Sequence, residues 1–182
     1  MLKRIFELRE NVTGESIPEF ATTLEVMMTE TELIFDFFCK NSKYFSFTTE
    51  YNGPVFKGDA CEIFLSSCGD VSRYYEIEVA PNGCVFLADI INDGNLNSKN
   101  GIVINYIDDC FVTAKVEKFN DVDYRCTISI PLEKIRYDEN KGIKFNAYRI
   151  ETEGGYTDKN LLALNPTFKY KFHCPECFID LK

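Results

Sequence analysis

Three polar side chains, Tyr74, Glu76 and Glu78, alternate with apolar residues along the run 74–79. Such period-two alternation predicts a strand of an antiparallel sheet with one buried face and one polar face. Carboxylates beside an aromatic ring suit a hydroxyl-rich ligand, because carboxylates accept hydrogen bonds and rings pack on apolar C–H faces. The polar face of this strand is therefore either a ligand site or ordinary solvated surface.

The same two glutamates have a spacing that glycosidases use. Residues two apart on one strand face are about 6.6 Å apart at the backbone, near the carboxylate separation of inverting glycosidases. Alternating E-I-E patterns also occur in retaining β-sandwich glycoside hydrolases, but those enzymes need a longer acidic motif and a much larger substrate cleft. We therefore predict that Glu76 and Glu78 lie on a solvated outer face, and a glycoside hydrolase is the weaker alternative.

The run HCPEC, with His173, Cys174 and Cys177, contains half of a zinc site. No second ligand pair with this spacing is evident in the sequence. His173 is the single histidine of the chain, so Ser–His–Asp or Cys–His catalysis would have to use it, yet no nucleophile motif accompanies it. We predict no metal site at this run, no catalytic residues and no enzyme activity.

A second polar run, Asp89–Asn97, offers several oxygen ligands near a glycine but lacks the distal glutamate of an EF-hand loop. A polar loop is the simpler interpretation. We expect no cofactor, and a structural calcium ion is the alternative.

The composition of the chain limits the classes of partner that it can bind. The net charge of −9 argues against nucleic acid and anionic membranes, which require clustered lysine and arginine. Charges recur within the first ten residues, so no signal peptide is expected, and no apolar run has transmembrane length. These features predict a cytoplasmic location, in which the eight cysteines are free thiols. The sequence does not predict an oligomeric state.

Many short strands punctuated by Gly, Asn and Asp predict a β-sandwich or barrel. We expect one domain over residues 1–182 and one short helical turn at Pro131–Ile135. The predicted strands are Leu24–Met28, Glu32–Phe38, Tyr44–Thr48, Ala60–Leu65, Tyr74–Ala80, Cys84–Ile90, Gly101–Tyr106, Phe111–Phe119, Tyr124–Ile130, Ile143–Glu151 and Phe178–Leu181.

Four blocks in order give the chain a family resemblance. They are Asp59-x-x-Glu62-x-Phe64 with the following YEIEVAPNG, then YRCTISIP at 124–131, FNAYRIE at 145–151, and LLALNPTFKYKFHCPECFIDL at 161–181. Together they resemble the carbohydrate-binding module family 9-like domains. The resemblance implies an all-β, antiparallel, jelly-roll-like β-sandwich that binds the ends of mono- or oligosaccharides without cleaving them.

The resemblance also implies site residues. Sugar-binding members hold a saccharide between two aromatic rings, and the matching positions here are Phe56 and Leu164. Glu62 and Arg149 match polar positions of the family, and Asn160 lies near a further one. Glu62 and Arg149 also have a purely structural interpretation, as an ion pair or a hydrogen-bond anchor in the sandwich. With Tyr74 from the polar strand face, these six residues form the predicted ligand site.

Leucine at 164 departs from the family pattern, because it has no flat π-face for stacking. This departure supports an alternative in which the chain keeps the fold but serves as a cytoplasmic interaction or sensing domain.

Overall fold

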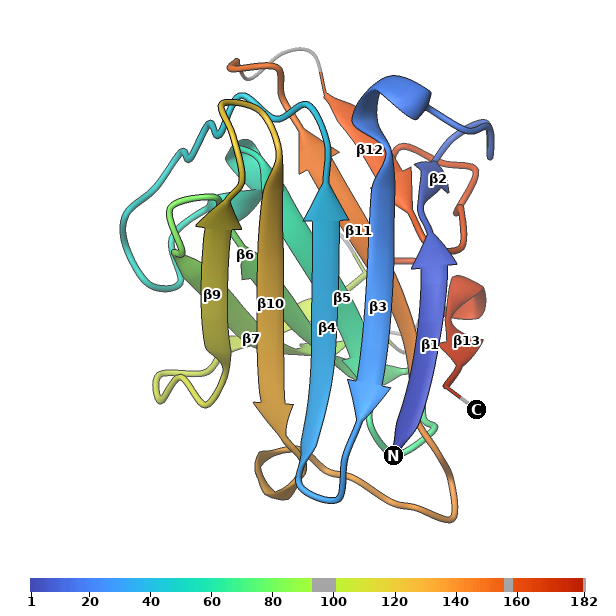
Figure 1. The fold of residues 1–182 in the computed structure, drawn as a ribbon. Helices are drawn as coiled ribbons and strands as arrows, with labels where there is room; N and C mark the ends of the chain where they lie inside the picture. The colour runs from blue at the N-terminus through green and yellow to red at the C-terminus, as the bar shows by residue number, and fades with distance from the viewer. Residues whose placement is uncertain (93–100, 156–158, 182) are drawn as a thin grey trace.

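Two antiparallel β-sheets facing each other make up the computed structural model, which describes residues 1–92, 101–155 and 159–181 (Figure 1). The helices among these residues are single 3-10 turns. None of the described helices is long and apolar enough to cross a membrane. The prediction of an all-β, jelly-roll-like antiparallel sandwich is confirmed.

The first sheet has five strands. Their spatial order is β1 (Leu2–Glu7), β3 (Thr22–Met28), β4 (Glu32–Cys39), β10 (Tyr124–Pro131) and β9 (Thr113–Lys118).

The second sheet has eight strands, and β13 (Ile179–Asp180) extends it beside β11. The order of the other seven is β2 (Arg9–Glu10), β12 (Asn160–Ala163), β11 (Lys144–Glu151), β5 (Ala60–Ser66), β6 (Arg73–Val79), β7 (Val85–Ile91) and β8 (Val103–Tyr106).

The main core lies between the sheets and follows from the alternation of the strands. Ile63 of β5 and Ile77 of β6 are paired in register and fully buried, and so is Phe35 of β4 in the first sheet. The rings of Phe35 and Phe145 meet edge to face with their centroids 5.4 Å apart. Burial of these side chains stabilises the sandwich by roughly 1.5–3 kcal/mol each.

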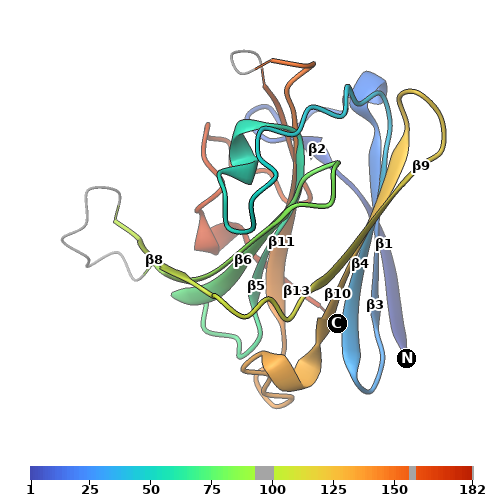
Figure 2. The same cartoon turned by 90° about the vertical axis from the view of Figure 1, so that its left-hand side faces the viewer.

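The outer face of the second sheet is covered as well. The C-terminal segment after β12, red in Figure 2, lies on the side of this sheet that faces away from the first sheet. Phe172 stacks on Tyr148 of β11 at 4.1 Å, and His173 stacks on Phe64 of β5 at 4.9 Å. Because both faces are covered, β5 is buried at every residue, on polar and apolar sides alike.

This cover makes one sequence prediction wrong. Glu76 and Glu78 do not lie on a solvated face, since the two residues are only 6% and 2% exposed. The alternation predicts one buried face and one solvated face, but in this sheet it separates two buried environments.

A buried carboxylate ties the loops to the start of β5. Asp59 accepts hydrogen bonds from Ser42 Oγ and the Phe45 amide at one oxygen, and from the amide and hydroxyl of Thr152 at the other. The first acidic residue of the Asp59-x-x-Glu62 block is therefore an anchor of the scaffold.

Most of the predicted strands are present, and the helical turn forms as a 3-10 turn at Leu132–Lys134. The predicted strand Tyr44–Thr48 is instead a loop, in which Tyr44 has φ of 55°. Strands β1, β2 and β12 were not predicted. The two short ones, β2 and β12, form along each other, with Leu162 paired to Glu10, and have too few residues to show a period.

Candidate functional site

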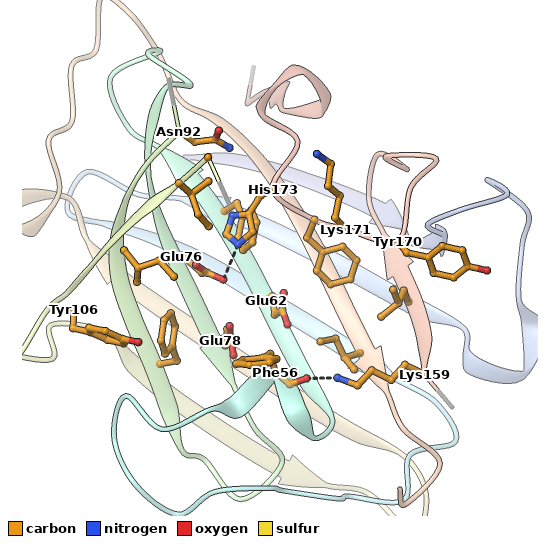
Figure 3. Close-up of a pocket in the computed structure, with 18 residues that line it drawn as sticks. Phe56, Glu62, Glu76, Glu78, Asn92, Tyr106, Lys159, Tyr170, Lys171 and His173 are labelled. Atoms are coloured by element: carbon orange, nitrogen blue, oxygen red, sulfur yellow. Dashed lines mark hydrogen bonds and ion pairs between the residues drawn. The ribbon is translucent and has the colours of Figure 1, made fainter. Parts of the chain in front are cut away.

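A pocket of about 750 Å³ opens on the outer face of the second sheet (Figure 3). Its floor comes from β5 and β6, and its walls come from β7, β8, β11, β12, the 3-10 turn Val55–Lys57 and the C-terminal segment. The lining combines aromatic rings with a few acidic and basic groups, as ligand pockets do. The lining residues are Phe56, Glu62, Phe64, Glu76, Glu78, Phe86, Asn92, Gly101, Ile102, Ile104, Tyr106, Ile150, Lys159, Leu161, Tyr170, Lys171, Phe172 and His173.

Three glutamates form the floor of this pocket. Glu62 on β5 is paired in register with Glu78 on β6, and Glu76 lies two residues away on the same face of β6. Cross-strand partners have their Cβ atoms about 5 Å apart. The antiparallel pairing therefore concentrates three carboxyl groups in one small area.

Burial changes the acidity of all three. It raises the pKa of Glu76 to about 7. Burial first, and then the charge of Glu76, raises the pKa of Glu62 well above its usual range. Burial, followed by the charges of Glu62 and Glu76, does the same to the pKa of Glu78. The floor therefore holds protons near neutral pH that ordinary glutamates have lost.

His173 lies over one end of this floor. Its Nε2 atom is 3.8 Å from Glu76 Oε1, and its Nδ1 atom is 2.8 Å from the hydroxyl of Tyr74. Burial, followed by the charge of Lys171, lowers the pKa of His173 to about 4. The imidazole is therefore neutral at pH 7 and does not balance the charge of Glu76.

Lys159 stands at the opposite end, where Figure 3 shows its ammonium directed at the main chain of Phe56. Lys159 Nζ donates a hydrogen bond of 2.5 Å to the Phe56 carbonyl oxygen. Burial lowers the pKa of Lys159, and the charges of Glu62 and Glu78 oppose that effect.

Exposed aromatic rings surround the opening. Phe56 is 47% exposed, Tyr106 of β8 is 59% exposed, and Tyr170 of the C-terminal segment is 87% exposed. Tyr106 is held by an edge-to-face contact with Phe86, with their ring centroids 5.7 Å apart. Exposed rings beside buried carboxylates provide flat apolar faces next to hydrogen-bond acceptors.

The structure brings together some of the residues predicted for the site. Phe56 and Glu62 both line the pocket. Tyr74 lies behind the wall, where its ring stacks on Phe64 and its hydroxyl contacts His173. It therefore supports the pocket wall.

Arg149 lies elsewhere and does not pair with Glu62, but it is the buried ion pair and hydrogen-bond anchor that the structural interpretation predicts. On β11, Arg149 is paired with Cys61, and its neighbour Tyr148 is paired with Glu62. The Arg149 side chain thus points to the inner face, where it is fully buried. Its guanidinium donates hydrogen bonds to Glu151 and to the carbonyl oxygens of Phe20 and Lys40. The two bonds to carbonyl oxygens connect the second sheet to segments that flank strands of the first sheet.

The two remaining predicted positions are also outside the described pocket lining. Leu164 packs against the core between the sheets. The Asn160 side chain donates to Glu153 Oε1 at 2.9 Å, whereas its neighbours Lys159 and Leu161 line the pocket.

The two runs considered for metals have other contacts. Cys174 lies close to Glu176, and His173 faces the pocket. Asp89 is bound by both Arg73 and Arg136. The remainder of Asp89–Asn97, from residue 93 on, lies outside the described residues.

Sequence reasoning missed several lining residues. The alternation of Glu76 and Glu78 predicts one face of a strand, but it also predicts that this face is solvated. Tyr106, Tyr170 and Lys159 give no signal, because they come from the edge strand β8, the C-terminal segment and the residue before β12, which meet only in the folded chain.

Comparisons with known proteins agree with this architecture. A structure from Bacteroides uniformis superimposes with a TM-score of 0.72 at 18% identity, over 96% of this chain and 84% of that one. A family 9 carbohydrate-binding module from Caldicellulosiruptor kristjanssonii, solved with glucose, has a TM-score of 0.61 at 14% identity, over 97% of this chain and 83% of that one. These likenesses support the fold.

A curated relative from Arthroderma benhamiae is 27% identical over 169 residues, which are 86% of this chain and 76% of the relative. It is described as an extracellular protein, so the predicted cytoplasmic location finds no support. The model of carbohydrate-binding family 9 matches residues 11–182. The chain belongs to carbohydrate-binding family 9.

Proposed function

We propose that the pocket on the outer face of the second sheet binds the terminal units of a saccharide and does not cleave them. The observation that carries this proposal is the combination of exposed rings at the rim with buried carboxylate oxygens on the floor. Pyranose rings have apolar C–H faces that pack on aromatic rings, and hydroxyls that donate to carboxylates.

The family and the pocket dimensions support the proposal. Family 9 is a carbohydrate-binding family, and two structures of family 9 modules similar in fold to this chain were solved with glucose and with cellotriose. A cavity of about 750 Å³ is within the usual range for small-molecule sites. It has room for more than one sugar unit.

Phe56 takes the place of one stacking platform in this proposal. The second platform is Tyr106, since Leu164 lies in the core and presents no ring. Tyr106 lies on the edge strand β8, whereas Leu164 follows β12, so the second ring would come from a different part of the sheet.

The test is a glycan array followed by calorimetry with cellobiose and glucose. The wild type is compared with Phe56→Ala and with Phe119→Ala, a matched exposed phenylalanine outside the pocket lining. We expect Phe56→Ala to weaken binding about 2- to 12-fold, the range for one aromatic contact. Equal affinity of the two variants would show that the site is elsewhere.

The glycosidase alternative uses Glu76 and Glu78, which do lie in the pocket. In the same samples, chromatography of the sugar after overnight incubation measures cleavage. Binding without cleavage predicts an unchanged sugar. Release of shorter products that disappears in Glu76→Gln would replace the binding proposal with a hydrolase.

A further inference from the structure

The pocket floor concentrates more carboxyl groups than a neutral sugar requires. We propose that the pocket selects saccharide ends that carry a free ammonium group, as in 2-amino-2-deoxyhexoses, and that this ammonium binds between Glu62 and Glu78. This inference rests on the proposed function and names its ligand class.

Unpartnered oxygens provide the first argument. Glu62 Oε1, Glu76 Oε2 and Glu78 Oε2 are buried, and within the described part of the chain they have no hydrogen-bond partner. Figure 3 shows these three side chains converging on the cavity from β5 and β6. Buried polar atoms in native proteins normally have hydrogen-bond partners. These three oxygens are therefore positioned to accept hydrogen bonds from a ligand.

Charge balance provides the second argument. In residues 1–92, 101–155 and 159–181, the ion pair made by these three glutamates is the 3.8 Å contact of Glu76 with His173. His173 is neutral at pH 7, because burial lowers its pKa to about 4. Hydroxyl donors would satisfy the oxygens without balancing their charge, whereas one ammonium supplies three donors and a positive charge.

The position of the lysines agrees with this assignment. Lys159 donates to the Phe56 carbonyl oxygen and not to a carboxylate. Lys171 is on the exposed rim. The charged groups that face the cavity are Glu62 of β5, Glu76 and Glu78 of β6, Lys159 before β12, and Lys171 and His173 of the C-terminal segment.

A metal ion fits the floor less well than an ammonium. The described residues contain no group of three His, Cys, Asp or Glu side chains arranged to hold one. The exposed rings at the rim also favour an organic cation, because an aminated pyranose can stack on Phe56 while its ammonium reaches the floor.

Binding of an ammonium must displace protons from the floor. Burial raises the pKa of Glu76 to about 7 and those of Glu62 and Glu78 well above their usual range. A bound positive charge favours the ionised carboxylates and lowers these pKa values. Affinity for the amino sugar therefore rises between pH 5 and pH 7, and protons are released to the buffer.

Calorimetry with matched disaccharides tests the inference. The ligands are β1,4-linked glucosamine disaccharide, cellobiose and the N-acetylated disaccharide, in which the charge is removed. At pH 7 we expect the wild type to bind the amino disaccharide at least about tenfold more tightly than cellobiose. Titrations in two buffers of different ionisation heat should show proton release with this ligand only.

Two variants locate the effect. Glu78→Gln should remove most of the preference for the amino disaccharide over cellobiose, and Glu117→Gln, at a partly exposed position on β9, should keep that preference. If Glu78→Gln does not fold, the proton release and the pH dependence of the wild type still decide.

The outcomes separate this inference from the proposed function. If cellobiose binds as tightly as the amino disaccharide, the ammonium assignment is wrong and the saccharide site stands. If neither binds, both proposals fail. If ethylammonium alone binds as tightly as the amino disaccharide, the pocket recognises a cation without a sugar, and the hexosamine assignment is wrong.

Discussion

Glu62 lies directly opposite Glu78 on neighbouring antiparallel strands, and each carries a buried carboxylate oxygen without a partner in the described residues. Like charges in this position destabilise a sheet. The fold tolerates the pair because burial and mutual repulsion keep protons on these groups. A destabilising feature built on rigid strands at the floor of a pocket is typical of a functional site.

Ionisation of Glu76 should lower the stability of the chain as pH rises from about 4.5 to 7, and the lowered pKa of His173 acts in the opposite direction over part of this window. Burial raises the pKa of Glu76 from 4.5 to about 7, so in this window the folded state binds more protons at this carboxyl group than the unfolded state. Ionisation of Glu76 alone should remove roughly 3 kcal/mol of the free energy of unfolding. Urea unfolding at pH 5 and pH 8 measures this change.

The control for this prediction is Glu76→Gln, which cannot ionise. Its free energy of unfolding should fall less between pH 5 and pH 8 than that of the wild type, although Glu62 and Glu78 still contribute in the same direction. Identical pH slopes in the two proteins would show that Glu76 titrates normally.

Arg149 should act on stability and not on sugar binding. Arg149→Met leaves the buried Glu151 carboxylate without its partner, which destabilises by about 3–5 kcal/mol in comparable cases. Urea unfolding measures this loss, and calorimetry on the folded variant should give a sugar affinity within about twofold of the wild type, as expected for a side chain on the opposite sheet face. Loss of sugar binding without loss of stability in Arg149→Met would instead show that Arg149 belongs to the ligand site.

These residues show where sequence reasoning succeeds. The strands and the sandwich follow from alternation and turn residues, because those signals are local. The residues of the family blocks can be placed on strands, but the sheet face each side chain uses depends on register. Register places Arg149 opposite Cys61 and Glu62 opposite Tyr148. The side chains of Arg149 and Glu62 therefore lie on opposite faces of the sheet.

The misplacement of Glu76 and Glu78 has a different cause. Alternation reports two faces of a strand, and it does not report what covers them. Here the cover comes from Phe172 and His173, nearly a hundred residues further along the chain. Tyr106 and Tyr170 reach the rim in the same way, through contacts that no local pattern encodes.

Tyr106 should supply the second stacking ring. Tyr106→Ala removes an exposed ring of the pocket rim and should weaken saccharide binding about 2- to 12-fold. Tyr106→Phe keeps the ring and should bind nearly as well as the wild type. If both variants bind like the wild type in calorimetry, the rim ring at 106 does not contact sugar.

Tyr74 should support the pocket through His173. Tyr74→Phe removes the hydroxyl that contacts His173 Nδ1 and Asn92 Nδ2, and should lower the free energy of unfolding by about 1 kcal/mol. Calorimetry should show at most a twofold change in sugar affinity. A large loss of affinity at unchanged stability would instead place the Tyr74 hydroxyl in contact with the ligand.

A crystal structure of the chain with cellobiose would locate the bound sugar. We expect a terminal pyranose in the pocket, stacked on Phe56 and within hydrogen-bond distance of Glu62 or Glu78. An empty pocket with the sugar ordered elsewhere, for example in the smaller cavity beside Tyr137 and Leu181, would contradict this expectation.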